Sequence, residues 1–233
     1  MRRKVILATG NLYHIFNRGV EKRKIFLDDK DYFRFLHDLY EFNDLNAALN
    51  INYYFSHQNY GNQVSIVRPR ERKLLVDVLC FCLMPTHFHL LVRQIRDDGI
   101  KLFLQKLTGG YARYFNTKYK RVGPLFQGPF KAILIEKENY FLHLSRYIHL
   151  NPVELIQPDW KEQGIKDWTE VNKFLAAYRW SSLLDYIGIN NYPSVINKGL
   201  IEAYFKTPQE YKAFVTDWKA EDFQKLTMET RFP

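Results

Sequence analysis

Short apolar runs and longer amphipathic stretches alternate along the first 150 residues of the chain. Apolar runs bounded by turn-forming residues predict strands over residues 12–17, 74–84, 88–95 and 130–135. Apolar positions at helical spacing predict helices over residues 28–40, 98–121 and 137–150. Between the first helix and the second strand, we expect a strand over 51–55 and a hairpin or loop over 57–72.

Strands that alternate with long helices indicate an α+β fold with an antiparallel-rich sheet and helices on one face. The third helix ends at Asn151-Pro152, because the residue before a proline is pushed out of the α-helical region. From about residue 153 onward the pattern predicts loops and short helices, with four tryptophans as anchors. We therefore expect one domain over residues 1–153 and a mainly helical C-terminal extension over 154–233.

The charge balance favours a polyanionic partner. The 233 residues include 34 Lys and Arg against 25 Asp and Glu, which gives a formal charge of +9. Aromatic residues make up 16% of the chain, and several alternate with cations between Tyr111 and Arg121. Cations for phosphates and rings for unstacked bases suit single-stranded nucleic acid. The alternative is that the rings form core and the cations only interact with solvent.

Two features bear on where the protein works. Cys80 and Cys82 share one side of a predicted strand without further cysteine partners, which favours reduced, buried thiols over a disulfide or a zinc site. The basic start of the chain is too short for a signal peptide, and no later run reaches membrane-spanning length. We therefore expect a cytoplasmic protein without a membrane partner.

A histidine pair lies in the predicted strand that begins near Pro85. Residues two apart in a strand face the same side, so His87 and His89 project together while Phe88 points to the opposite face. Two neutral imidazoles on one side make half of a metal site, because a divalent ion needs further ligands. Two partly buried histidines with ordinary hydrogen bonds are the alternative.

A polar stripe follows the third predicted helix. His143, Tyr147 and Asn151 are spaced by four residues and so share one helical face. A phenol and a carboxamide in this arrangement can present a nucleophile and an oxygen ligand to one ion. Alternatively, Asn151 caps the helix and Tyr147 is a boundary aromatic.

These motifs together resemble the HUH-superfamily single-tyrosine transposases, in particular the IS200-like branch associated with repetitive extragenic palindromes (REPs). The resemblance covers roughly residues 12–153. It is carried by the following segments: YHIFNRG over 13–19, IFLDD over 25–29 with Tyr32, His87-Phe88-His89 after Met84-Pro85, GPLFQG over 123–128 with Lys131, and RYIHLNPV over 146–153.

The resemblance implies a ferredoxin-like fold and a metal-dependent nickase that joins single-stranded DNA through a 5′-phosphotyrosine. Tyr147 would be the nucleophile, and His87 and His89 would bind a divalent ion. Asn151 stands where relatives place a polar third ligand, commonly Gln. Imidazole and oxygen ligands suit Mg²⁺ or Mn²⁺, although zinc or nickel could occupy such a site. His143 is a candidate to orient the tyrosine or the ion, and a structural role is the alternative.

The partner that the resemblance implies is single-stranded DNA with palindromic hairpins, bound by a monomer or a homodimer. Candidate phosphate contacts are Arg18, Arg113, Lys118, Lys120, Arg121 and Lys131. Tyr111, Tyr114 and Tyr119 lack the amide partner that Tyr147 has, so we expect them to pack or to stack on bases. The C-terminal extension would pack on the catalytic domain or contact DNA. The alternative function is a catalytically silent regulatory relative that binds DNA or RNA.

Overall fold

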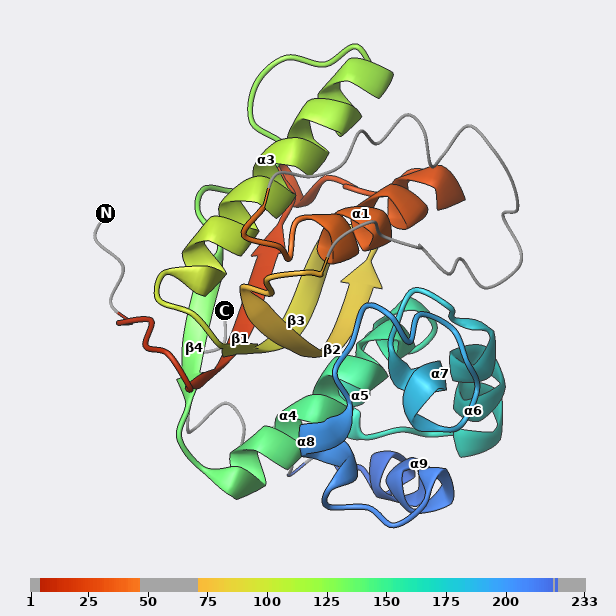
Figure 1. Ribbon diagram of the computed structural model, residues 1–233. Coiled ribbons are helices and arrows are strands. Elements are labelled where there is room, and N and C mark those ends of the chain that lie inside the picture. The colour runs from red at the N-terminus through yellow and green to blue at the C-terminus, as the bar shows by residue number, and fades with distance from the viewer. Residues whose placement is uncertain (1–4, 47–70, 220, 222–233) are drawn as a thin grey trace.

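The computed structural model describes residues 5–46, 71–219 and 221 (Figure 1). The strands are β1 (Leu12–Arg18), β2 (Val76–Met84), β3 (His87–Gln94) and β4 (Lys131–Ile135). The long helices are α1 (Asp29–Glu41), α3 (Gly99–Lys118) and α4 (Glu138–Leu150). These elements follow the predicted order. The strand expected over 51–55 and nearly all of the loop expected over 57–72 lie outside the described residues.

The C-terminal part of the described chain is built from short helices, as the sequence indicates. They are α5 (Trp160–Gln163), α6 (Trp168–Ala177), α7 (Leu183–Tyr186), α8 (Gly199–Glu202) and α9 (Pro208–Thr216). Two 3₁₀ helices, η1 (Val20–Lys22) and η2 (Asn151–Leu155), follow β1 and α4.

The four strands form one antiparallel sheet in the order β2-β3-β1-β4. β1 lies inside the sheet and pairs with β3 on one side and β4 on the other, while β2 pairs with β3 and forms an isolated antiparallel bridge from Cys82 to Ser181. With α1 between β1 and β2, and α3 between β3 and β4, this is the ferredoxin-like arrangement. The structure thus confirms the α+β fold.

Local sequence signals place the helix ends. The Asp28 side chain accepts a hydrogen bond from the Asp31 backbone N–H, and Asp31 returns the bond to the start of α1, which completes a capping box. α4 ends at Leu150, as expected. Asn151 nevertheless keeps helical dihedral angles (φ −51°, ψ −37°), because Pro152 is accommodated in the first turn of η2.

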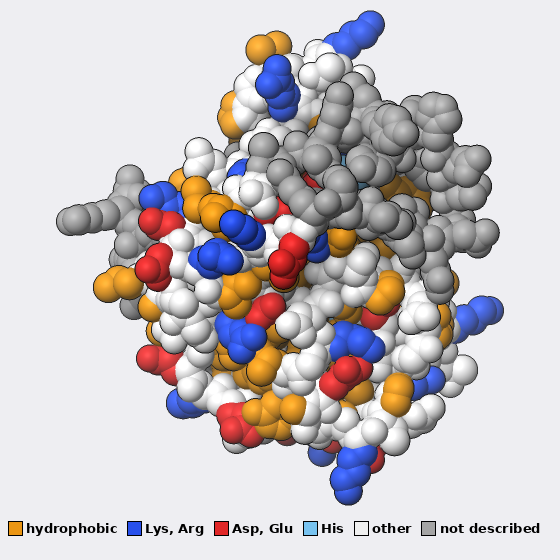
Figure 2. Space-filling model, viewed as in Figure 1, with side chains coloured by type: hydrophobic (Ala, Val, Ile, Leu, Met, Phe, Trp, Pro, Cys, Tyr) orange, Lys and Arg blue, Asp and Glu red, His pale blue; other side chains and the backbone are white. Residues whose placement is uncertain are grey.

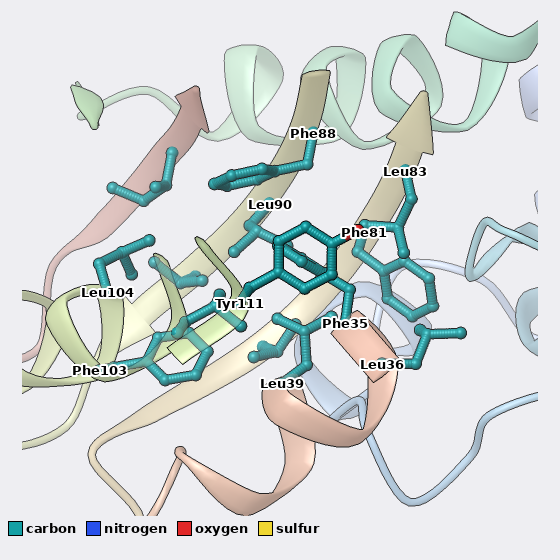
Figure 3. Packing of buried hydrophobic residues seen from close by; sticks show 14 of the residues in the cluster. Phe35, Leu36, Leu39, Phe81, Leu83, Phe88, Leu90, Phe103, Leu104 and Tyr111 are labelled. Atoms are coloured by element: carbon teal, nitrogen blue, oxygen red, sulfur yellow. The ribbon is translucent and has the colours of Figure 1, made fainter. Parts of the chain in front are cut away.

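Both faces of the sheet are covered (Figure 1). α1 and α3 share one face, where Phe88 and Leu90 pack with Phe35 and Tyr111 (Figure 3). α4 and the C-terminal helices cover the other face. Cys80 and Cys82 are free thiols in that second core, as predicted. The sequence predicts helices on one face, and the structure adds a helical layer on the other. This second layer forms because α4 is amphipathic and packs its apolar side on the sheet.

A chain of buried hydrogen bonds ties the C-terminal helices to α4 and the sheet. His149 lies 2.7 Å from the Tyr211 hydroxyl on α9 and 2.8 Å from the Ser182 hydroxyl before α7. Ser182 in turn accepts a hydrogen bond of 2.9 Å from the Phe81 backbone N–H in β2. His149 is therefore a structural residue on the side of α4 away from Tyr147. Within the described ranges, no helix has both the length and the apolar character that crossing a bilayer requires.

Replacing Phe88 by alanine should cost about 3–5 kcal/mol of unfolding free energy, because its buried ring fills the core against Phe35 and Phe126. Val122 is 94% exposed, so Val122→Ala should change it by less than about 0.5 kcal/mol. Urea unfolding measures both. Equal effects of the two substitutions would contradict the packing assigned to Phe88.

Candidate active site

The two histidines of β3 lie on the sheet face that α4 covers. The antiparallel register sets Arg18 of β1 opposite His87 and Phe16 opposite His89. The two imidazole rings face each other edge to face, with centroids 5.0 Å apart. The strand alternation predicted from the sequence is therefore present.

A third histidine, His14 of β1, lies beside this pair. Its Nε2 is 2.9 Å from Nδ1 of His89, so one of these nitrogens donates a hydrogen bond and the other accepts it. This contact orients the His89 ring and leaves its Nε2 as the nitrogen outside the bond. Sequence reasoning did not assign His14 to the site, because only the pairing of β1 with β3 brings the two rings together.

Burial keeps the histidines of this face uncharged at neutral pH. It lowers the pKa of His87 to about 4 and that of His14 to about 3. The pKa of His89 lies well below its ordinary value, first because of burial and then because of the neighbouring His87 and His14. A neutral imidazole is the form that binds metal ions.

Tyr147 points from α4 toward the histidines. Its ring is edge-on to His89, with centroids 6.1 Å apart. One turn later, Asn151 donates a 2.8 Å hydrogen bond from Nδ2 to the Tyr147 backbone carbonyl. The Asn151 Oδ1 is buried and has no hydrogen-bond partner among the residues that the structure describes. The structure thus brings together Tyr147, Asn151 and the histidine pair, which are distant in sequence.

Two tryptophans of the C-terminal region enclose the tyrosine. Trp160 stacks near it at 6.1 Å between ring centroids and Trp218 lies at 6.3 Å. Tyr147 is only 3% exposed, so its hydroxyl can meet a phosphate only after surrounding side chains shift. Burial raises the pKa of Tyr147, while Lys161 opposes that rise.

Lys161 and Glu154 are site residues that the sequence did not reveal. Lys161 Nζ lies 5.7 Å from the centroid of the Tyr147 ring and forms a 2.8 Å ion pair with Glu154. Both are ordinary charged residues by sequence, since η2 carries Glu154 and the packing of α5 on α4 brings Lys161 to the tyrosine. His143 instead lies 2.8 Å from Arg146 and packs against Phe214 of α9. These contacts direct His143 toward α9.

Several predicted DNA-binding cations have protein partners. Lys118 makes 2.8 Å contacts with Asp28 and Asp31, and these carboxylates raise its pKa although burial opposes the charge. Arg121 donates a 2.7 Å hydrogen bond to Asn116, and Arg18 donates one to Gln127. The exposed candidates are Arg18, Arg113, Lys120 and Lys131. Figure 2 shows Lys and Arg side chains interspersed with Asp and Glu on the face viewed.

The tyrosines of α3 and its end serve packing. Tyr111 is buried and donates a hydrogen bond of 2.5 Å to the Ile25 carbonyl. Tyr114 and Tyr119 donate hydrogen bonds of 3.1 and 2.8 Å to the Asp31 carboxylate. They contribute to the same cluster that holds Lys118, between α1 and α3.

Residues 54–151 match the family described as "Transposase IS200 like". The matched span contains His87, His89, Tyr147 and Asn151, and it confirms the resemblance that the motifs indicate. The match supports an enzyme of the transposase class that acts on DNA. Comparison with curated protein sequences finds no match.

Solved structures of transposases are also similar to the chain. A REP-associated tyrosine transposase bound to a REP hairpin is 14% identical, with a TM-score of 0.48, over 84% of this chain and 91% of the other. A Deinococcus radiodurans R1 structure that carries the name of a transposase is 15% identical, with a TM-score of 0.34, over 64% of this chain and 95% of the other.

The buried histidines should make the protein less stable as the pH falls. His87, His14 and His149 have pKa values lowered to about 4, 3 and 3 in the folded state, against 6.5 without burial. Below pH 6.5 the unfolded chain therefore binds more protons, so stability is fully present above this pH and is lost toward pH 4. Each histidine contributes up to about 1.4 kcal/mol per pH unit.

Urea unfolding between pH 7.5 and 5.0 measures this loss. His149→Gln should reduce the slope by about one proton, because it removes one of the buried imidazoles. A free energy of unfolding that stays constant over this range would contradict the neutral, buried state of these side chains.

Proposed function

We propose, from the match of residues 54–151 to the IS200-like transposases, that this protein nicks and rejoins single-stranded, hairpin-associated DNA with Tyr147 as its nucleophile. The observation that carries the proposal is the position of Tyr147, whose ring lies against His89 although 58 residues separate them in the chain. A nucleophile beside two uncharged imidazoles is an arrangement that suits phosphodiester cleavage.

The cleavage step exchanges one phosphate ester for another. The Tyr147 oxygen bonds to the phosphorus, and the bond from phosphorus to the 3′ oxygen breaks. The products are a 5′-phosphotyrosine and a 3′-hydroxyl. The phenol releases its proton to water and the departing 3′ oxygen takes one up, so the protons balance. Rejoining is the reverse, with a 3′-hydroxyl attacking the phosphotyrosine.

The residues present fit a divalent cation. Within the described ranges, the buried Asn151 Oδ1 lacks a hydrogen-bond partner, and a hard ion favours such an amide oxygen. His87 and His89 are neutral by burial, and the His14 contact orients His89. No group of three or more His, Cys, Asp and Glu side chains suited to a metal occurs in the described part of the chain, so the proposed set depends on Asn151. When bound, Mg²⁺ or Mn²⁺ would polarise the scissile phosphate as a Lewis acid.

The formal charge of +9 supports a nucleic-acid partner, although it does not select the sequence recognised. Among the candidate contacts, Arg18, Arg113, Lys120 and Lys131 are exposed, whereas Lys118 is held by two carboxylates. We assign phosphate binding to the exposed group and a structural role to Lys118. A catalytically silent binding protein, the alternative function, would use the same cations to bind phosphates and would not need Tyr147 as a nucleophile.

Tyr147→Phe should abolish covalent attachment to DNA, with adduct yield at least roughly 10³-fold lower, because no other group replaces the lost oxygen. Labelled single-stranded oligonucleotides, Mn²⁺ and a denaturing gel measure the adduct. Tyr119→Phe is the matched control and should retain it, since that phenol bonds Asp31 between α1 and α3.

Two outcomes would contradict the nucleophile assignment in different ways. If wild type and Tyr147→Phe give the same adduct, another residue is the nucleophile. If wild type binds the oligonucleotide and yields no adduct under any metal condition, the silent-binder alternative holds.

His89→Ala and Asn151→Leu should each weaken Mn²⁺ binding by about 10- to 100-fold, because each removes a ligand. Electron paramagnetic resonance of Mn²⁺ at pH 7.5 without DNA measures binding independently of activity. His37→Ala is the control, since His37 belongs to α1 on the opposite side of the sheet. Unchanged Mn²⁺ binding in both variants would refute the proposed ligand set.

A further inference from the structure

The chain beyond the matched span brings a cation to the nucleophile. Lys161 lies in the first turn of α5, ten residues after the end of the match. Its Nζ lies 5.7 Å from the centroid of the Tyr147 ring. Lys161 therefore places its positive charge beside the ring whose oxygen would react.

Neighbouring contacts hold this lysine in place. Glu154 of η2 forms the 2.8 Å ion pair with its Nζ. Trp160, the preceding residue, is fully buried and stacks near Tyr147, which anchors α5 against α4. The Lys161 side chain is 20% exposed, so most of its stem is packed. An ammonium held in this way is preorganised, in contrast to a lysine free in solvent.

We propose that Lys161 is a catalytic residue that stabilises the negative charge developing on the Tyr147 oxygen and the attacked phosphate, and that Glu154 positions it. The inference rests on the proposed function, and it assigns the C-terminal extension a part in the reaction. A fixed cation aimed at developing charge lowers the barrier without reorganising during the step.

Lys161 acts by charge alone. Burial lowers its pKa, but Tyr147 and Glu154 outweigh this effect and raise it, so the ammonium keeps its proton at neutral pH. It is therefore neither the base that receives the phenolic proton nor the acid for the leaving 3′ oxygen. Its loss should slow bond exchange without changing which bond breaks.

A second ion pair in the same segment provides a matched control. Lys166 Nζ lies 2.7 Å from Asp159, in a pair as short as that of Lys161 with Glu154. The Lys166 side chain is 64% exposed. Replacing either lysine by methionine therefore removes one ion pair and one positive charge. Of the two lysines, Lys161 is the one that lies beside the Tyr147 ring.

The experiment compares single-turnover adduct formation at saturating oligonucleotide, with Mn²⁺, in the full-length chain. Lys161→Met keeps the apolar stem and should lower the rate constant by about 100-fold. Lys161→Arg keeps the charge and should stay within about tenfold of wild type. Glu154→Gln should lower the rate about tenfold by loosening the ammonium. Lys166→Met should leave the rate within about twofold.

The affinity for DNA separates catalysis from simple binding. The Kd of Lys161→Met for the same oligonucleotide, measured without metal, should stay within about twofold of wild type, because the charge acts in the transition state. An equal rate in Lys161→Met and Lys166→Met would overturn the inference. So would a weaker Kd together with a wild-type rate constant at saturating oligonucleotide, since Lys161 would then only bind phosphate.

Folding and the proposed function are controlled separately. Loss of both DNA binding and native circular dichroism in Lys161→Met would mean that this variant does not fold. The rates of Lys161→Arg and Glu154→Gln then test the proposal, and a wild-type rate in Glu154→Gln would overturn the positioning role of Glu154. If wild type itself forms no adduct, the proposed function fails first and the inference falls with it. If wild type reacts and Tyr147→Phe does not, only the lysine variants bear on Lys161.

Discussion

The two-residue alternation of β3 is the constraint on which both layers of the structure depend. His87 and His89 face α4, while Phe88 and Leu90 face α1 and α3. β3 is paired on both sides, with β1 and β2, so its register is set twice. A slip by one residue would move the imidazoles into the apolar core and expel Phe88 from it. The same strand register therefore determines both the position of the histidines and the core packing that stabilises the fold.

Burial of the site has opposite effects on its components. It keeps the imidazoles neutral, which favours metal binding, and it raises the pKa of Tyr147, which disfavours a phenolate. The positive charge of Lys161 opposes the second effect, and so does Asn151. In the proposed reaction, the buried Tyr147 nucleophile would have the held ammonium of the extension beside it. Under that proposal, the packing of α5 on α4 contributes to the chemistry as well as to stability.

The basic character of the chain divides into structural and exposed parts. Lys118 joins α1 to α3 through Asp28 and Asp31, and Arg146 contacts backbone carbonyls of α9 and the segment after it. Cations such as Arg113 and Lys131 remain at the surface. The net charge therefore indicates a tendency to bind polyanions. Which cations can contact phosphate depends on which side chains already form ion pairs or hydrogen bonds within the fold.

The sequence by itself determined the order of strands and helices, the shared side of His87 and His89, and the helical stripe of Tyr147 and Asn151. These features follow from periods of 2 and 3.6 residues, which are local. The tertiary structure alone decided which faces meet. The contact of His14 with His89 depends on strand register, and that of Lys161 with Tyr147 depends on helix packing. Neither pairing has a local signal, because the residues involved are joined through space by the burial of apolar faces distant in the chain.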